Sequence, residues 1–100
     1  MALRVPQDKL KKLCRRYHIR KLAVFGSAAR GELGPRSDVD LMVEFEPNRA
    51  PSLWDAPAVD KAFSALFGNR PVDLVPPEVM RNPYRRRTIA RDLKVLYEAK

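Results

Sequence analysis

An apolar run that stops at a glycine, followed closely by an alternating segment, limits the folds open to this chain. Residues 22–25 are Leu-Ala-Val-Phe, and Gly26-Ser27 ends this run, whose length suits a buried strand. From residue 38 to residue 46, polar and apolar side chains alternate with a period of two, which predicts a second strand with one buried face. The chain is therefore expected to build a β-sheet.

Helical patterns flank these two strands. Apolar residues recur at helical spacing in residues 10–17 and 59–67, and Gly68 ends the second stripe. Ser27 is placed to cap a short helix that Gly31 would stop. A strand, a turn and a helix are thus predicted in succession around Gly26.

The remaining segments complete an alternation of strands and helices. Residues 71–75 and 93–97 have the pattern of short strands, and Asn82-Pro83 has the pattern of a helix cap followed by the first helical residue. This order indicates the α/β class, here a small mixed sheet of about four strands flanked by helices. One hundred residues with 45% hydrophobic content suit a single domain over 1–100.

Three aspartates lie at polar positions of the predicted strands. Asp38 and Asp40 are two residues apart, so their carboxylates project from one side while Val39 and Leu41 are buried on the other. Asp73 faces away from the apolar neighbours of its own strand. Carboxylate oxygens without a Cys/His cluster favour Mg²⁺ over softer metals. The sequence therefore predicts a site for divalent cations.

The Gly26-Ser27 turn is suited to hold phosphate. Glycine keeps no side chain between a ligand and the backbone, and a following helix would direct free N–H groups toward that ligand. Arg30 lies about one helical turn after Ser27, where it either neutralises a phosphate or is an ordinary surface charge. A Gly-Ser turn or an Asp-x-Asp pair alone is commonplace, but their joint placement predicts metal-dependent chemistry on a polyphosphate.

Charge is unevenly distributed along the chain, whose net charge is +8. Residues 1–37 hold ten Lys/Arg and two acids, residues 38–78 hold three and eight, and residues 79–100 hold seven and two. The acidic middle concentrates cations, and the basic flanks attract anionic partners. Charge alone does not choose among nucleotide, RNA and an acidic protein as the partner.

The single cysteine, the single tryptophan and the single histidine give weaker indications. Cys14, the only cysteine, cannot form an internal disulfide, so a cytoplasmic location and a place in the core are expected. Trp54 is expected to pack at the core or its rim rather than on a base, and His18 to cap the end of the first helix. Neither a secretion signal nor a membrane span is apparent.

Residues 24–31 and 37–41 resemble the minimal nucleotidyltransferases of the polymerase-β-like superfamily. The resemblance covers essentially the whole chain. It continues through residues 72–75 and 81–84, which are similar to later segments of that family, including MntA-type antitoxins paired with HEPN-domain toxins. The polymerase-β-like nucleotidyltransferase core is therefore the expected fold.

The resemblance also implies residue roles. Gly26 and Ser27 would hold the phosphates of a nucleoside triphosphate, and Asp38 and Asp40 would bind two Mg²⁺ ions. Asp73 matches the third acid, which in the superfamily helps bind the catalytic metal and deprotonate the attacking hydroxyl. All three acids are present, so the resemblance implies a competent site.

The reaction and partner that the resemblance implies are transfer of AMP from ATP to a tyrosine hydroxyl of a HEPN toxin. The chain is too short for the additional domains of larger relatives, so another molecule must complete the site. The basic residues 81–91 would then dock the toxin or help bind ATP.

Two other interpretations stay open. One is an antitoxin that blocks its partner sterically, and the other is a basic nucleic-acid-binding module. The second is less favoured because the sequence lacks interleaved aromatics. No residue indicates which base is bound, so the choice of adenine rests on the resemblance alone.

Overall fold

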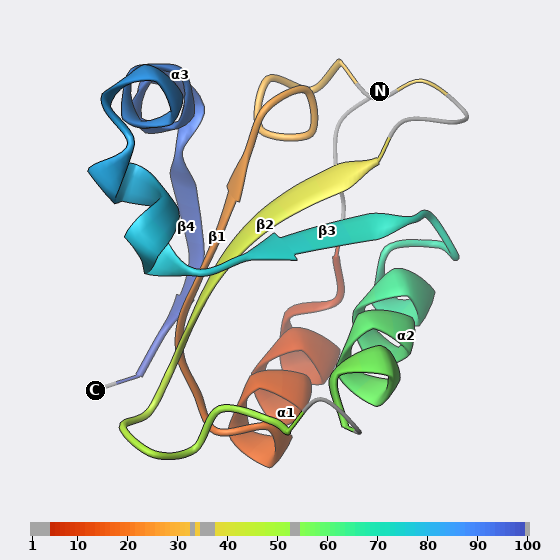
Figure 1. Cartoon of the computed structure of the whole chain (residues 1–100). Helices are drawn as coiled ribbons and strands as arrows, with labels where there is room; N and C mark the ends of the chain where they lie inside the picture. The colour runs from red at the N-terminus through yellow and green to blue at the C-terminus, as the bar shows by residue number, and fades with distance from the viewer. Residues whose placement is uncertain (1–4, 33, 35–37, 53–54, 100) are drawn as a thin grey trace.

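The computed structural model describes residues 5–32, 34, 38–52 and 55–99, which build a β-sheet with helices on both of its faces (Figure 1). The elements, in chain order, are α1 (Gln7–Arg16), β1 (Ile19–Phe25), β2 (Val39–Phe45), α2 (Ala56–Leu66), β3 (Val72–Val75), the 3₁₀ helix η1 (Pro77–Arg81), α3 (Pro83–Asp92) and β4 (Lys94–Glu98). The predicted α/β class is confirmed.

The four strands form one mixed sheet in the order β3-β2-β1-β4. β1 pairs antiparallel with both β2 and β4, whereas β2 pairs parallel with β3. β1 is the most deeply buried strand, with residues 22–25 all buried as their apolar run predicts. The prediction of a small mixed sheet of four strands is therefore correct.

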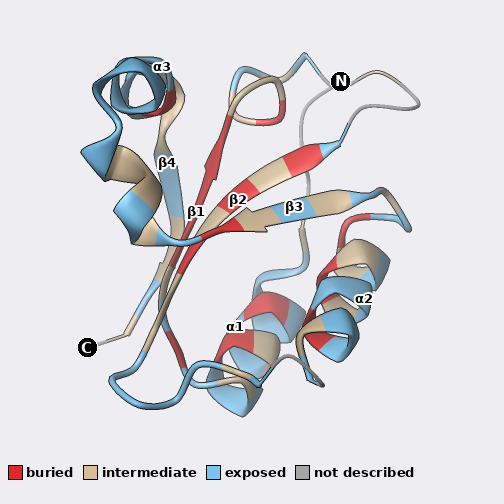
Figure 2. Ribbon diagram, viewed as in Figure 1, coloured by how far each residue is buried: buried red, intermediate tan, exposed pale blue. Residues whose placement is uncertain are grey.

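The two faces of the sheet are covered by different helices. Figure 1 shows α1 and α2 against one face, and α3 with η1 against the other. The alternating side chains of β2 divide between these faces, as Figure 2 shows in the changing colours along the strand. The larger core cluster, beneath α1 and α2, contains Leu10, Cys14, Ile19, Leu22, Val24, Ala28, Val39, Leu41, Val43, Val59, Phe63 and Phe67. The smaller cluster, beneath α3, contains Phe25, Val75 and Ile89.

The first helix forms as its apolar stripe predicts. The Leu10 N–H donates to the Pro6 carbonyl at 3.0 Å, and Leu10 and Cys14 are fully buried, so the core position of Cys14 is confirmed. His18 follows the helix with a φ of 58°, and its N–H donates to the Arg15 carbonyl at 3.3 Å. The backbone of His18 thus helps to end α1, as predicted, while its Nδ1 lies 3.8 Å from Glu46 Oε2.

Two segments differ from the sequence-based predictions. Residues 26–31 form a hydrogen-bonded turn instead of the short helix predicted after Ser27, because Gly31 interrupts the segment before a regular helix can propagate. The 3₁₀ helix η1 was not predicted. Trp54 lies outside the described residues, so its predicted packing stays a prediction. Among the helices that the structure describes, none has the length and apolar character needed to cross a membrane.

Candidate active site

Pairing between β2 and β3 brings two of the predicted acids side by side. The Cα of Asp40 is directly opposite that of Asp73, two positions before the pair formed by Met42 and Val75. Side chains at these alternate positions share the face that α3 covers, because the strand period is two. Asp38 precedes the first residue of β2 and is exposed. The three carboxylates thus lie at the same end of two neighbouring strands.

Gly26 lies against Asp40. It follows the last residue of β1, Phe25, whose Cα is opposite that of Asp40. The backbone of Gly26 has a φ of 71°, and a Cβ added there would stand 2.6 Å from Asp40 Oδ2. Any larger residue would be strained and would collide with the carboxylate. The expected phosphate turn and the expected metal ligands therefore adjoin one another.

The turn after Gly26 is held by its own backbone and by the core. The N–H groups of Ala29 and Arg30 both donate to the Gly26 carbonyl, at 3.1 and 3.3 Å, and the Glu32 N–H donates to the Ser27 carbonyl at 2.9 Å. Ala28 is 4% exposed and anchors the turn in the larger core. These bonds do not use the N–H group of Ser27, a half-buried residue at the start of the turn, where an anion could approach.

The pKa of Asp40 reflects the neighbouring acids. Burial raises the pKa of the Asp40 carboxyl, and the negative charges of Asp73 and Asp38 raise it further. The guanidinium of Arg85, in the first turn of α3, partly opposes these effects. Bringing like charges together in this way is unfavourable without a counter-ion. A bound cation would relieve the repulsion.

The donor set fits a hard divalent cation in chemistry, since it consists of carboxylate oxygens, one of which packs against Gly26. Across the described ranges, no three Asp, Glu, His or Cys side chains converge into a ready-made metal-binding cluster. The aspartates share an edge of the sheet without forming a closed cage. Their binding of Mg²⁺ is therefore taken up below as a proposal.

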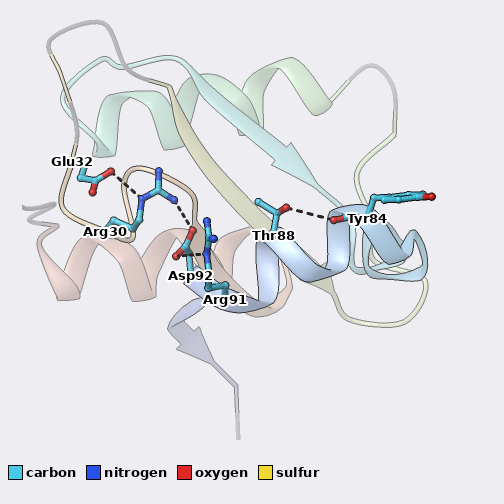
Figure 3. Close-up of polar contacts among 6 residues, drawn as sticks. All are labelled: Arg30, Glu32, Tyr84, Thr88, Arg91 and Asp92. Carbon is cyan, nitrogen blue, oxygen red and sulfur yellow. Dashed lines mark hydrogen bonds and ion pairs between the residues drawn. The ribbon is translucent and has the colours of Figure 1, made fainter.

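Arg30 is engaged by carboxylates (Figure 3). Its Nε donates to Glu32 Oε2 at 2.9 Å, and its Nη1 donates to Asp92 Oδ2 at 2.5 Å. Asp92 is the last residue of α3, and its side chain is only 8% exposed. The two acids raise the pKa of Arg30. In this structure Arg30 ties the turn to α3, and its predicted contact with phosphate stays a prediction.

Sequence reasoning missed Asp92, and it considered Arg85 only as part of the basic segment 81–91. Asn82 was correctly predicted to cap α3, because its Oδ1 accepts from the N–H groups of Tyr84 and Arg85 at 3.0 and 3.3 Å. This cap begins the helix that carries Arg85 over the sheet face of Asp40. Asp92 could have been noticed as the one acid among the arginines of residues 81–92, but its partner is 62 residues away.

A family model for the nucleotidyltransferase domain matches residues 7–96. The chain belongs to this nucleotidyltransferase family. The matched span contains the Gly26 turn and all three aspartates, so the site just described lies within the family's domain. Membership also confirms the family expected from residues 24–31 and 37–41.

Named relatives of this nucleotidyltransferase include archaeal proteins. "Putative protein adenylyltransferase MJ1379" of Methanocaldococcus jannaschii is 37% identical over 78 residues, which are 78% of this chain and 77% of that protein. "Protein adenylyltransferase MntA" of Thermococcus cleftensis is 45% identical over 65 residues, covering 65% of this chain and 63% of the relative. The expected similarity to MntA-type proteins is therefore confirmed.

Solved structures share the nucleotidyltransferase fold. One described as a "putative minimal nucleotidyltransferase" superposes with a TM-score of 0.68 and 33% identity, covering 88% of this chain and 86% of its own. Another, a "toxin-antitoxin with AMP-PNP", has a TM-score of 0.68 and 19% identity over 96% of this chain and 76% of its own. The expected polymerase-β-like core is confirmed by this agreement.

Proposed function

We propose that this nucleotidyltransferase transfers AMP from ATP to a tyrosine hydroxyl of a partner protein, a HEPN-type toxin, and thereby acts as its antitoxin. The observation that carries the proposal is the contact of Gly26 with Asp40, whose strand neighbour is Asp73. A turn suited to phosphate adjoins paired carboxylates, which is the arrangement that metal-assisted transfer from a triphosphate requires. Relatives named as protein adenylyltransferases support the acceptor class.

In this proposal the turn binds the phosphates and the aspartates hold the metal ions, while Asp73 also takes a proton. The turn at Gly26 and Ser27 would bind the triphosphate, and Asp38, Asp40 and Asp73 would hold two Mg²⁺ ions. Such ions, when bound, neutralise the triphosphate and lower the pKa of the attacking hydroxyl. Asp73 accepts the proton of the tyrosine hydroxyl while the tyrosine oxygen bonds to the α-phosphorus. The bond between the α- and β-phosphates breaks, and pyrophosphate leaves.

The partner must present its tyrosine at the carboxylates, because the described residues themselves form one compact sheet with no second lobe over the site (Figure 1). A solved toxin–antitoxin complex with AMP-PNP has the same fold as this chain. The single cysteine is a buried free thiol, which suits a reducing compartment, so the cytoplasm is the proposed location.

The proposal is tested with ATP labelled at either the α- or the γ-phosphate, Mg²⁺, and the protein encoded beside this one. Label from the α-position is expected on a tyrosine of the partner, with none from the γ-position and none after chelation of the metal. Label from the γ-position would indicate phosphorylation and would contradict the proposal.

A sterically acting antitoxin would give a different result. It would neutralise its partner without any labelling, and Asp40→Asn would leave neutralisation intact. Peptide mass spectrometry of the partner, combined with a toxicity assay of the Asp40→Asn variant, distinguishes the two functions.

A further inference from the structure

Tyr84 is presented to solvent far more than the other tyrosines. It is 86% exposed, whereas Tyr17 and Tyr97 are half-buried and pack against the larger core. Within the described ranges, the other large hydrophobic residue classed as exposed is Val95, at 48%. A phenol acts as an acceptor only when its hydroxyl can be reached, so Tyr84 is the tyrosine best placed to be modified.

The backbone of Tyr84 is firmly fixed. Asn82 Oδ1 accepts from the Tyr84 N–H at 3.0 Å, and Thr88 Oγ1 donates to the Tyr84 carbonyl at 3.5 Å. Pro83, at the first position of α3, has a fixed φ that suits the start of a helix. Figure 3 shows the ring projecting from the end of α3, away from the helix body. The helix cap thus fixes the position of the backbone that carries the exposed ring.

The charges around Tyr84 complement those of the nucleotidyltransferase site. Arg85, Arg86 and Arg87 follow it directly and are exposed. The site offers exposed carboxylates at Asp38 and Asp73. A basic segment carrying the acceptor would therefore be attracted to an acidic site that carries the donor. Tyr17, although it also follows two arginines, has its ring in contact with Arg16 at 5.6 Å and with the core.

Geometry favours transfer between two copies rather than within one. The Arg30–Asp92 ion pair joins the phosphate turn to the last residue of α3, whereas Tyr84 lies near the first (Figure 3). Arg85, the neighbour of Tyr84, acts on Asp40, so it is the direction of the Tyr84 ring, and not the length of α3, that keeps its hydroxyl away from the site of its own copy. The Tyr84 ring also points away from the turn, so its hydroxyl is directed toward another molecule.

We propose that Tyr84 is a site of self-adenylylation, modified in trans by a second copy of this chain. The inference rests on the proposed function, which supplies ATP and the transfer chemistry. The Tyr84 hydroxyl oxygen of one copy bonds to the α-phosphorus of ATP in the other. The phosphoanhydride bond to the β-phosphate breaks, pyrophosphate leaves, and the hydroxyl proton passes to Asp73 of the donor copy.

Mixing two variants with different affinity tags tests the proposal. The Asp40→Asn copy retains Tyr84 but lacks a site carboxylate, and the Tyr84→Phe copy retains the site but lacks the acceptor. With α-labelled ATP and Mg²⁺, label is expected on Asp40→Asn only in the mixture. Neither variant incubated alone is expected to be labelled. Fragmentation of the intact protein should place the adenylyl group on Tyr84, and wild-type labelling should rise with protein concentration.

Controls keep the two hypotheses separate. Tyr17→Phe and Tyr97→Phe are expected to be labelled as the wild type is, and Tyr84→Phe is expected to modify the partner protein normally. Transfer to the partner without labelling of Asp40→Asn in the mixture would overturn this inference and leave the proposed function standing. Labelling at Tyr17 or Tyr97 instead of Tyr84 would also overturn it. If neither the partner nor this chain is labelled, both hypotheses fail.

Discussion

Gly26 is glycine for two reasons that can be separated by experiment. Its φ of 71° is costly for a side chain, and an added Cβ would stand 2.6 Å from Asp40 Oδ2. Gly68 has a similar φ of 73°, but a Cβ there would meet nothing within 4 Å. The two glycines therefore share the backbone cost and differ in the collision with a site residue.

We predict that Gly68→Ala lowers the free energy of unfolding by about 1 kcal/mol, the usual cost of a left-handed backbone for an L-residue. Gly26→Ala is expected to lower it by about 2–3 kcal/mol, because Asp40 must also move. Only Gly26→Ala should abolish transfer. Urea denaturation and the labelling assay measure both effects. Equal losses of stability in the two variants would show that the contact with Asp40 is unimportant.

Cys14 gives a second residue-level prediction, in the alkaline range. Burial raises the pKa of its thiol from 9.0 to about 12. Between these values the unfolded chain has lost the proton and the folded chain keeps it, so folding stability falls as the pH rises above 9. The fall attributable to this thiol is at most about 1.4 kcal/mol per pH unit.

Denaturation of the wild type and of Cys14→Ala across pH 8 to 11 tests this expectation. At pH 8 the variant should be less stable because it leaves a cavity, but above pH 9 its stability should decline less steeply. At pH 8 the thiol of the folded wild type should react with a disulfide reagent only after unfolding. Parallel declines in the two proteins would contradict the assigned burial effect.

The aspartates were predictable from sequence, whereas their charged neighbours were not. A period of two is a local property, so Asp40 could be assigned to the polar side of its strand without a structure, whereas Asp38, predicted on the same strand, lies one residue before β2. The pairing of Asp40 with Asp73 and the approach of Arg85 depend on which strands and helices become neighbours. Those contacts are set by the tertiary fold.

At the level of elements, the strands and long helices matched their patterns, and the shortest elements did not. The turn at 26–31 replaced a predicted helix, and η1 was missed, because single-turn elements carry too few residues for a periodic signal. α3 is also unusual for its exposure, since Ile89 is its one fully buried residue. Its position over the site therefore depends on few contacts.

The ion pair between Arg30 and Asp92 is one of those contacts, and we predict that it restrains α3. In Asp92→Ala the amides of α3 and of residues 26–31 should exchange with solvent faster than in the wild type. Glu32→Ala is the matched control, because Glu32 also binds Arg30 but directly follows the turn and does not contact α3 through this ion pair. Hydrogen exchange followed by mass spectrometry provides the measurement. Equal exchange in the two variants would show that the ion pair does not hold the helix.

At the scale of the whole molecule, a cavity and the candidate active site lie at opposite ends of β2 and β3. A cavity of about 830 Å³ lies at the opposite ends of β2 and β3, and its lining includes Phe45, Pro47 and Pro76 but none of the predicted site residues. The site instead lies where the acidic strands meet the basic helix α3. The sequence-based prediction of a single domain over residues 1–100 stays a prediction, as does the identity of the partner.

The central hypothesis is that the three aspartates beside the Gly26 turn perform nucleotidyl transfer. Asp40→Asn removes a charge that burial and two neighbouring carboxylates disfavour, so we expect a melting temperature equal to or above that of the wild type. Loss of activity in this variant could not then be ascribed to unfolding. Asp60→Asn, an exposed acid on α2, makes the same chemical change outside the site.

The most direct measurement is the rate of AMP transfer from α-labelled ATP to the partner protein by these matched variants. Asp38→Asn, Asp40→Asn and Asp73→Asn should each reduce the rate by about 100-fold or more, since metal-assisted charge stabilisation contributes several kcal/mol. Asp60→Asn should transfer at the wild-type rate. Transfer that persists in Asp40→Asn and Asp73→Asn would contradict the hypothesis that these carboxylates form the active site.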